Sequence, residues 1–530
     1  MPIWPAALMS AGEIDRRTLI AGGSAALMLH PFAALGAAAN PVVRTSSGDF
    51  IGRNLDGIAA FKGIRYASAE RFRAPTPVSR PGERIDALNF GPIAPQGGSG
   101  ASPQSEDCLF LNIWTSTTRP TAKLPVMLYI HGGGYSNGSV TDPLNDGAAL
   151  AARGDCVVVT VNHRLNALGY LYLARLDLRF DDSGNLGQLD LILALQWVKA
   201  NIGAFGGDPG RVMVFGQSGG GAKIATLMAM PATSGLFHRA ATMSGQQVTA
   251  SGPLNATARA QAYLARLGVS ERDLSPLLKM PVEKLVEALA STDPILGGSV
   301  YFGPVLDMKW LIRHPFWPDA APQSRGIPMM LGNTHDETRA FIAPDSEKVK
   351  TLNWDNLAER IAPELRIDIL PEWVVSQYRA RFPDWSPTDI FYDATTCGRS
   401  WRGQVIEAEA RATAGVPAWV YQVDFTARVD PRRRAMHTID IPLVFGTLGA
   451  QGSKTGTGAE AKAASIAMQD CFVTFAKSGD PNHAACPNWP RYKLGRRSTM
   501  IFDARSRIEE NPRAWQRELF ARVPYIQPGS

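Results

Sequence analysis

Residues 212–221 read VMVFGQSGGG, a pattern typical of a strand that turns sharply into a helix. The first four residues are apolar, as in a buried strand, and residues 222–230 carry a helical pattern. Between them, glycines flank Ser218 and allow a sharp turn that exposes its hydroxyl beside the helix N-terminus. Glycine fills 50 of 530 positions, so the G-x-S-x-G pattern alone is weak. The strand-turn-helix context is what predicts that Ser218 is a nucleophile.

Further apolar, β-branched-rich runs lie outward from this stretch. They predict buried strands, and residues 186–202 repeat apolar side chains at helical spacing. Strands that alternate with helices indicate an α/β fold with a mostly parallel central sheet flanked by helices. Chemistry in such folds gathers beyond the carboxyl ends of the strands. The strands are expected at 126–130, 157–161, 212–215 and 329–331.

A second glycine turn, HGGG at 131–134, directly follows the first of these strands. Its backbone N–H groups could point at a bound carbonyl oxygen, because glycine permits that close approach. We therefore predict an oxyanion hole formed by the N–H groups of Gly133, Gly134 and Gly219. The alternative is an ordinary glycine-rich hairpin turn.

A serine nucleophile needs a base and an orienting carboxylate, which follow it in the order serine, acid, histidine in this type of fold. The polar turn GNTHDE at 332–337 offers two adjacent carboxylates, Asp336 and Glu337, and spacing does not separate them. Among eight histidines, His437 lies in a late loop downstream of these acids. We expect His437 to be the base.

These motifs resemble the type-B carboxylesterase family, which includes cholinesterases and many bacterial esterases. The resemblance implies an α/β-hydrolase fold with helical insertions over the active site. It also implies a serine carboxylic ester hydrolase that needs no cofactor and no metal, with Glu337 as the acid and His437 as the base. The ordered landmarks are FKGIRYA (61–67), SEDCLFLNIW (105–114), VNHRL (161–165), GNLG (184–187), NIGAFGGDP (201–209), the two glycine turns, 332–337 and FAKSGDPN (475–482).

Several positions depart from the family pattern. Gln217 and Gly219 stand where the family usually has Glu and Ala, and neither side chain is expected to perform the chemistry. Thr438 and Asp440 replace the usual Gly and Glu, which predicts an altered pocket near the base. Cys108 lacks the family's usual partner and is expected to be unpaired. The loop 96–108 has no tryptophan to bind a quaternary ammonium, so a choline-ester specialist is not expected.

The expected substrate is a small to medium organic ester, cleaved through an acyl-enzyme intermediate. The same machinery could act on an amide, carbamate or lactone. A non-catalytic binding protein of cholinesterase type is a further alternative, although such proteins typically lose the nucleophile. The acyl and alcohol preferences are not readable from the sequence. We expect the pocket lining to come from two helical insertions, 246–302 and 351–389.

The overall composition restricts the possible partners. The net charge of +6 is spread along the chain, so no nucleic-acid partner is expected. The five cysteines, odd in number and scattered, form neither a disulfide framework nor a Cys-x-x-Cys metal site. The oligomeric state cannot be read from the sequence. The cysteines are Cys108, Cys156, Cys397, Cys471 and Cys486.

The N-terminus resembles a bacterial twin-arginine export signal. Arg16 and Arg17 precede the apolar run 18–29 and the small residues 36–39. The run is shorter than the ~20 residues of a spanning helix and is followed by Pro31, which argues against a stable membrane anchor. An uncleaved anchor and an ordinary helix are the alternatives. We expect residues 1–39 to be the signal, 40–530 to be a single domain, and the protein to be periplasmic or secreted.

Overall fold

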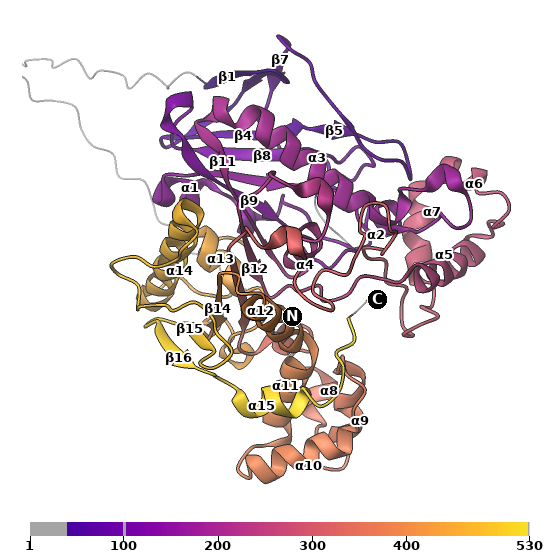
Figure 1. Cartoon of the computed structure of the whole chain (residues 1–530), viewed down its shortest axis with the longest axis vertical. Helices are drawn as coiled ribbons and strands as arrows, with labels where there is room; N and C mark the ends of the chain where they lie inside the picture. Colours follow the sequence, from indigo (N-terminus) through magenta and orange to yellow (C-terminus); the bar gives the residue numbers. More distant parts are fainter. Residues whose placement is uncertain (1–39, 99–101, 528, 530) are drawn as a thin grey trace, which may run out of the picture. The chain divides into compact units, whose positions relative to one another are not determined.

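The computed structural model describes residues 40–98, 102–527 and 529 (Figure 1). The expected export signal at 1–39 lies outside the described residues. From Asn40 onward, the described residues form one compact unit. No helix among them is both long and apolar enough to cross a bilayer.

An 11-stranded sheet forms the centre of the described chain. Seven neighbouring strands, from β10 to β15 across the sheet, run parallel, and the strands at both edges pair antiparallel. The predicted α/β fold with a mostly parallel sheet is therefore confirmed. In spatial order the strands are β16 (Arg507–Glu510), β15 (Ser498–Phe502), β14 (Ala418–Val423), β13 (Met329–Thr334), β12 (Arg239–Met243), β11 (Gly207–Gln217), β9 (Leu124–Ile130), β10 (Val157–Val161), β8 (Phe110–Thr115), β4 (Ile58–Arg65) and β3 (Arg53–Leu55).

Helices cover both faces of this sheet, which explains why its strands are apolar throughout. Successive side chains of a strand point to opposite faces. On β9, Leu128 belongs to a core cluster with Ile192 of α3, and the next residue, Tyr129, belongs to a second cluster with Phe472 of α14. All seven residues of β9 are buried as a result. The helices near the sheet are α1 (Ala148–Gly154), α2 (Asn166–Tyr170), α3 (Leu186–Asn201), α4 (Gly219–Leu227), α12 (Arg402–Thr413), α13 (Asp440–Phe445) and α14 (Ala459–Ser478). Helix α15 (Ala514–Phe520) instead packs Leu519 and Phe520 into a separate core cluster with residues from the segment 349–405.

Two groups of helices pack around small cores of their own. One lies within the predicted insertion 246–302, and the other spans 347–396, which begins before and ends after the predicted insertion 351–389. They form separate lobes in Figure 1, with α5 to α7 in one and α8 to α11 in the other. Their bounds are α5 (Pro253–Leu267), α6 (Ser275–Lys279), α7 (Val282–Glu287), α8 (Glu347–Lys350), α9 (Leu357–Ile361), α10 (Pro371–Arg381) and α11 (Pro387–Thr396). Away from the main sheet, β1 (Val42–Thr45), β2 (Gly48–Ile51) and β7 (Arg84–Asp86) form a small sheet, and β5 (Ala67–Ser68) pairs with β6 (Thr76–Pro77).

A buried ion pair ties the loop after β10 to α3. The guanidinium of Arg164 donates to Asp190 at 2.6 and 2.9 Å, and the Arg164 backbone N–H also donates to Asp190 at 2.9 Å. The two side chains are only 5% and 0% exposed. Removing one partner of such a pair leaves an uncompensated charge in the interior.

We therefore expect Asp190→Asn to lower the free energy of unfolding by about 3–5 kcal/mol, because the Arg164 charge stays buried without its counter-ion. Chemical denaturation of purified protein measures the change. Glu83→Gln is the matched control, since its pair with Arg80 is half exposed and worth no more than about 1 kcal/mol. Equal losses in the two variants would show that the buried pair has no special role.

Candidate active site

Ser218 occupies the sharp turn between β11 and α4. Its φ of +54° lies in the left-handed region, which side chains other than glycine rarely adopt. The turn is held by the Ser218 N–H, which donates to the Met243 carbonyl at 2.7 Å. The chain approaches its neighbours so closely here that a methyl group on Gly220 would overlap the Ile130 carbonyl oxygen. Helix α4 begins at Gly219, three residues before the predicted start, because these glycines form its first turn.

Glu337 and His437 meet at the carboxyl end of the sheet. His437 Nδ1 is hydrogen-bonded to Glu337 Oε2, and both side chains are buried. Glu337 Oε1 accepts from the Thr334 N–H at 2.8 Å and from Asn333 Nδ2 at 3.0 Å. Burial alone would raise the pKa of Glu337, but His437, Ser244 and Thr334 together hold it below its ordinary value. Glu337 is therefore a carboxylate at neutral pH.

Asp336, the other carboxylate that the sequence offered, faces away from His437. It lies 3.1 Å from His335 Nδ1 and 3.3 Å from Arg339 Nε. Burial raises its pKa, but these partners outweigh burial and hold the value at about 2. The fold thus separates two carboxylates that are adjacent in the chain, and it is Glu337 that contacts the histidine.

Gln217 contributes a contact that the sequence analysis missed. Its Nε2 lies 3.0 Å from His437 Nε2. A neutral histidine that donates from Nδ1 to Glu337 has a free lone pair on Nε2, so the Gln217 amide can donate to it. We expected the Gln217 side chain not to perform the chemistry, and the structure adds that its amide contacts the nitrogen that a base would use.

The predicted oxyanion turn lies beside Ser218. Gly133 and Gly134 have φ values of +88° and +63°, and within the described residues their N–H groups have no hydrogen-bond acceptor. Gly134 and Gly219 line the same cavity as Ser218, whereas Gly133 lies in the exposed part of the turn. Free N–H groups at such a turn can bind a developing negative charge.

Lys223, which the sequence analysis did not single out, holds the glycine turn 131–134 through a hydrogen bond. Its Nζ donates to the Gly134 carbonyl at 2.6 Å, and it is fully buried on α4. Burial lowers the pKa of Lys223 to about 7. A methyl group on Gly219 would overlap the same Gly134 oxygen. The family usually has alanine at position 219. An alanine would not fit here, because the Gly134 carbonyl points toward residue 219 and Lys223.

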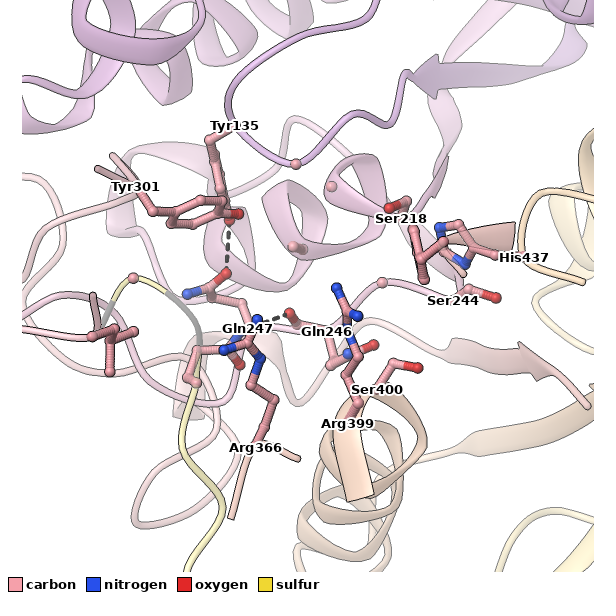
Figure 2. A pocket seen from close by; sticks show the side chains of 18 of the residues that line it. Tyr135, Ser218, Ser244, Gln246, Gln247, Tyr301, Arg366, Arg399, Ser400 and His437 are labelled. Atoms are coloured by element: carbon pink, nitrogen blue, oxygen red, sulfur yellow. Dashed lines mark hydrogen bonds between the residues drawn. The ribbon is translucent and has the colours of Figure 1, made fainter. Parts of the chain in front are cut away.

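A cavity of about 370 Å³ contains both Ser218 and His437 (Figure 2). The first predicted insertion, 246–302, supplies much of its wall, but the second, 351–389, supplies only Arg366. Predicted site residues such as Ser218 and His437 supply part of the remaining wall, and the rest comes from segments that the sequence analysis did not indicate, including residues 525–527 and 529. The lining residues outside the two glycine turns are Tyr135, Ala222, Ser244, Gly245, Gln246, Gln247, Asp293, Leu296, Gly297, Ser299, Tyr301, Phe341, Arg366, Arg399, Ser400, His437, Tyr525, Gln527 and Gly529.

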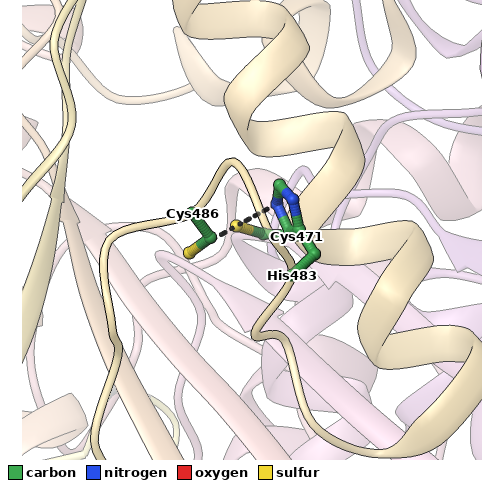
Figure 3. Close-up of side chains that lie close together, drawn as sticks. All are labelled: Cys471, His483 and Cys486. Carbon is green, nitrogen blue, oxygen red and sulfur yellow. Dashed lines mark hydrogen bonds between the residues drawn. The ribbon is translucent and has the colours of Figure 1, made fainter.

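Three possible metal ligands lie together elsewhere, at the end of α14 (Figure 3). Cys471 Sγ lies 3.6 Å from both His483 Nε2 and Cys486 Sγ, and all three ligand atoms are within 4.8 Å of one another. Two thiols and an imidazole suit a soft ion such as Zn²⁺. The sequence analysis treated these cysteines as scattered, but the fold brings two of them together. Cys108 is buried and free.

A serine on a strand-helix elbow, a buried Glu–His pair and a glycine turn on a mostly parallel sheet define an α/β-hydrolase. Residues 39–520 match the Carboxylesterase family, and the chain belongs to that family.

Known relatives agree with this assignment. The chain is 36% identical to para-nitrobenzyl esterase of Bacillus subtilis, over 90% of this chain and 98% of that one. It is 32% identical to fumonisin B1 esterase of Sphingopyxis macrogoltabida, over 87% and 88% of the two chains. The crystal structure of a carboxylesterase from Geobacillus stearothermophilus superposes with a TM-score of 0.81 at 35% identity, over 90% and 99%. The protein is a serine carboxylic ester hydrolase.

Asp440 is fully buried at the start of α13, close to the Glu–His pair. Burial, and then the charge of Glu337, raise its pKa to about 7, although His437 acts in the opposite direction. An unfolded chain would ionise this carboxyl near pH 4, while the native protein keeps the proton up to about pH 7. The Asp440 carboxyl therefore costs native stability progressively as the pH rises between these values.

Asp440→Asn removes this dependence, because the amide cannot ionise. We expect the melting temperature of the variant, relative to the original protein, to rise as the pH increases from 4 to 8. The corresponding free energy approaches at most about 4 kcal/mol. Thermal unfolding at a series of pH values measures the difference. A difference that stays constant with pH would show that Asp440 ionises normally in the folded state.

Proposed function

We propose that this protein hydrolyses a small to medium carboxylic ester through a triad of Ser218, His437 and Glu337. The observation that carries the proposal is the buried contact between His437 and Glu337, at a cavity that Ser218 also lines. The position of Ser218 on a strained elbow supports the same assignment, because its hydroxyl is partly exposed while its backbone is fixed.

Glu337 holds His437 with its proton on Nδ1, which leaves Nε2 able to accept the proton of the Ser218 hydroxyl. The serine oxygen then attacks the ester carbonyl. The N–H groups of Gly133, Gly134 and Gly219 hold the resulting oxyanion, and one such donor is typically worth about 3 kcal/mol. His437 passes its proton to the departing alcohol. Water then attacks the acyl-enzyme by the same route and releases the acid.

Gln217 fits this scheme as a group that holds His437 between turnovers. Its amide donates to Nε2 only when that nitrogen carries no proton, so the contact favours the tautomer that can act as a base. The Ser218 hydroxyl must displace this amide when the substrate is bound. Gln217 is therefore a positioning residue, because it acts through the histidine.

Removing the nucleophile tests the proposal directly. We expect Ser218→Ala to lower kcat for a p-nitrophenyl ester by about 10⁴-fold or more, since the remaining groups supply only oxyanion binding. Ser400→Ala is the matched control, because Ser400 lines the same cavity without touching the Glu–His pair. We expect Glu337→Gln to lower kcat strongly and its neighbour Asp336→Asn to retain activity. Undiminished turnover by Ser218→Ala would refute the triad.

We also propose that residues 1–39 direct export by a twin-arginine route, on the basis of Arg16, Arg17 and the apolar run after them. Expression in a bacterium with that pathway, followed by N-terminal sequencing of the exported protein, checks this. We expect a mature terminus near residue 40 and loss of export in the Arg16→Lys, Arg17→Lys double variant. An exported protein that begins at Met1 or Pro2 would contradict cleavage.

A further inference from the structure

Two arginines from different elements face the catalytic cavity. Arg366 lies in the loop before α10, and Arg399 lies in a π-helical turn, Cys397–Trp401. Figure 2 shows both side chains pointing into the cavity that contains Ser218 and His437. π-Helical turns are rare and frequently occur at functional sites. Here the turn brings both Arg399 and Ser400 into the cavity lining.

The ion pairs among the described residues do not fully balance the positive charge of Arg366 and Arg399. Arg399 Nη1 lies 3.1 Å from Glu364, which also pairs with Lys348 at 2.8 Å. Arg366 makes no ion pair within the described part of the chain, and its Nε is buried without a hydrogen-bond partner. Arg399 and Lys348 therefore share the single carboxylate of Glu364, and Arg366 has no carboxylate partner among the described residues. Burial, and then the nearby charge of Arg366, lower the pKa of Arg399 below its ordinary value.

The acidic residue in the cavity lining does not offset this charge. Asp293 pairs with Arg259 at 2.8 Å, and both side chains are almost fully buried. Asp293 also accepts hydrogen bonds from the backbone N–H groups of Ile295 and Leu296. Its charge is therefore already matched, so Asp293 does not neutralise Arg366 or Arg399.

Arg399 is also connected to the base by a single aromatic ring. Its guanidinium carbon lies 4.6 Å from the centre of the Phe341 ring, and that ring is centred 4.8 Å from the imidazole of His437. An anion bound at Arg399 would thus be separated from the catalytic histidine by little more than one ring. This distance from the histidine is short enough for the anion to be a charged group of the substrate itself.

We propose that Arg366 and Arg399 form a subsite for a carboxylate of the substrate, so that this enzyme prefers esters that carry a negative charge beside the cleaved bond. The inference rests on the ester hydrolysis proposed above and specifies its substrate class. Guanidinium groups match carboxylates in shape as well as charge, and such hydrogen bonds are stronger than neutral ones. Gln246 and Gln247 also line this cavity and supply further polar groups beside the two arginines.

Matched ester pairs test the subsite. For the acyl side, p-nitrophenyl butyrate is compared with mono-p-nitrophenyl glutarate; for the alcohol side, phenyl acetate is compared with 4-acetoxybenzoate. We expect a higher kcat/KM for the charged member of at least one pair, and a preference that weakens as salt is added. In Arg366→Gln and Arg399→Gln, the charged-to-neutral ratio should fall about 10- to 100-fold. Arg80→Gln, at an exposed pair, is the control and should leave the ratio unchanged.

A binding measurement keeps the test independent of turnover. Glutarate should raise the melting temperature of Ser218→Ala protein. This increase should be smaller in the Ser218→Ala, Arg366→Gln double variant. Phosphate at the same concentration shows whether the site prefers a carboxylate to another anion. The subsite is refuted if neither ester pair shows a charge preference, or if the arginine variants leave the ratio unchanged. It is also refuted if phosphate stabilises as well as glutarate. If instead no ester is hydrolysed, or hydrolysis survives Ser218→Ala, the proposed function itself fails.

Discussion

The close contact between the Ser218 elbow, strand β9 and the glycine turn is the constraint on which the rest of the site depends. Gly220 lies against the Ile130 carbonyl, and Gly219 lies against the Gly134 carbonyl, at separations that leave no space for a methyl group. Only glycine permits such approach of one backbone to another. This contact places a serine with a strained backbone next to a turn with free N–H groups. The sheet holds both segments, because β9 and β11 are neighbouring parallel strands.

The charges around the site divide into two kinds. The buried groups near the Glu–His pair are matched or neutralised: Glu337 has several donors, Lys223 donates to a carbonyl with its pKa near 7, and Asp440 keeps its proton up to about that pH. The wall formed by Arg366 and Arg399 is different, because its positive charge exceeds the carboxylates beside it. This excess beside a cavity that contains Ser218 is the basis for the proposed carboxylate subsite.

Family membership accounts for the shared architecture, and the departures from the family pattern account for local differences. Gln217 is uncharged and can donate to His437, which a glutamate at this position could not do. Gly219 makes room for the Gly134 carbonyl that Lys223 binds. Asp440 fills a fully buried position near the pair. These substitutions lie next to the proposed triad and not in it. They change the surroundings of the triad but not the residues that would perform the reaction.

The sequence by itself determined the α/β fold, the family and the candidates Ser218, Glu337 and His437, because local patterns carry this information: apolar strands, glycine turns and the order of motifs along the chain. The tertiary structure decided what depends on contacts between distant segments. It brought Glu337, which the family resemblance had implied, into contact with His437, placed Gln217 beside His437 and Lys223 beside Gly134, and brought the free Cys471 and Cys486 close together. It also placed Arg366, Arg399 and the C-terminal residues around one cavity. No local pattern encodes these neighbours, since long-range packing alone sets which side chains share a space.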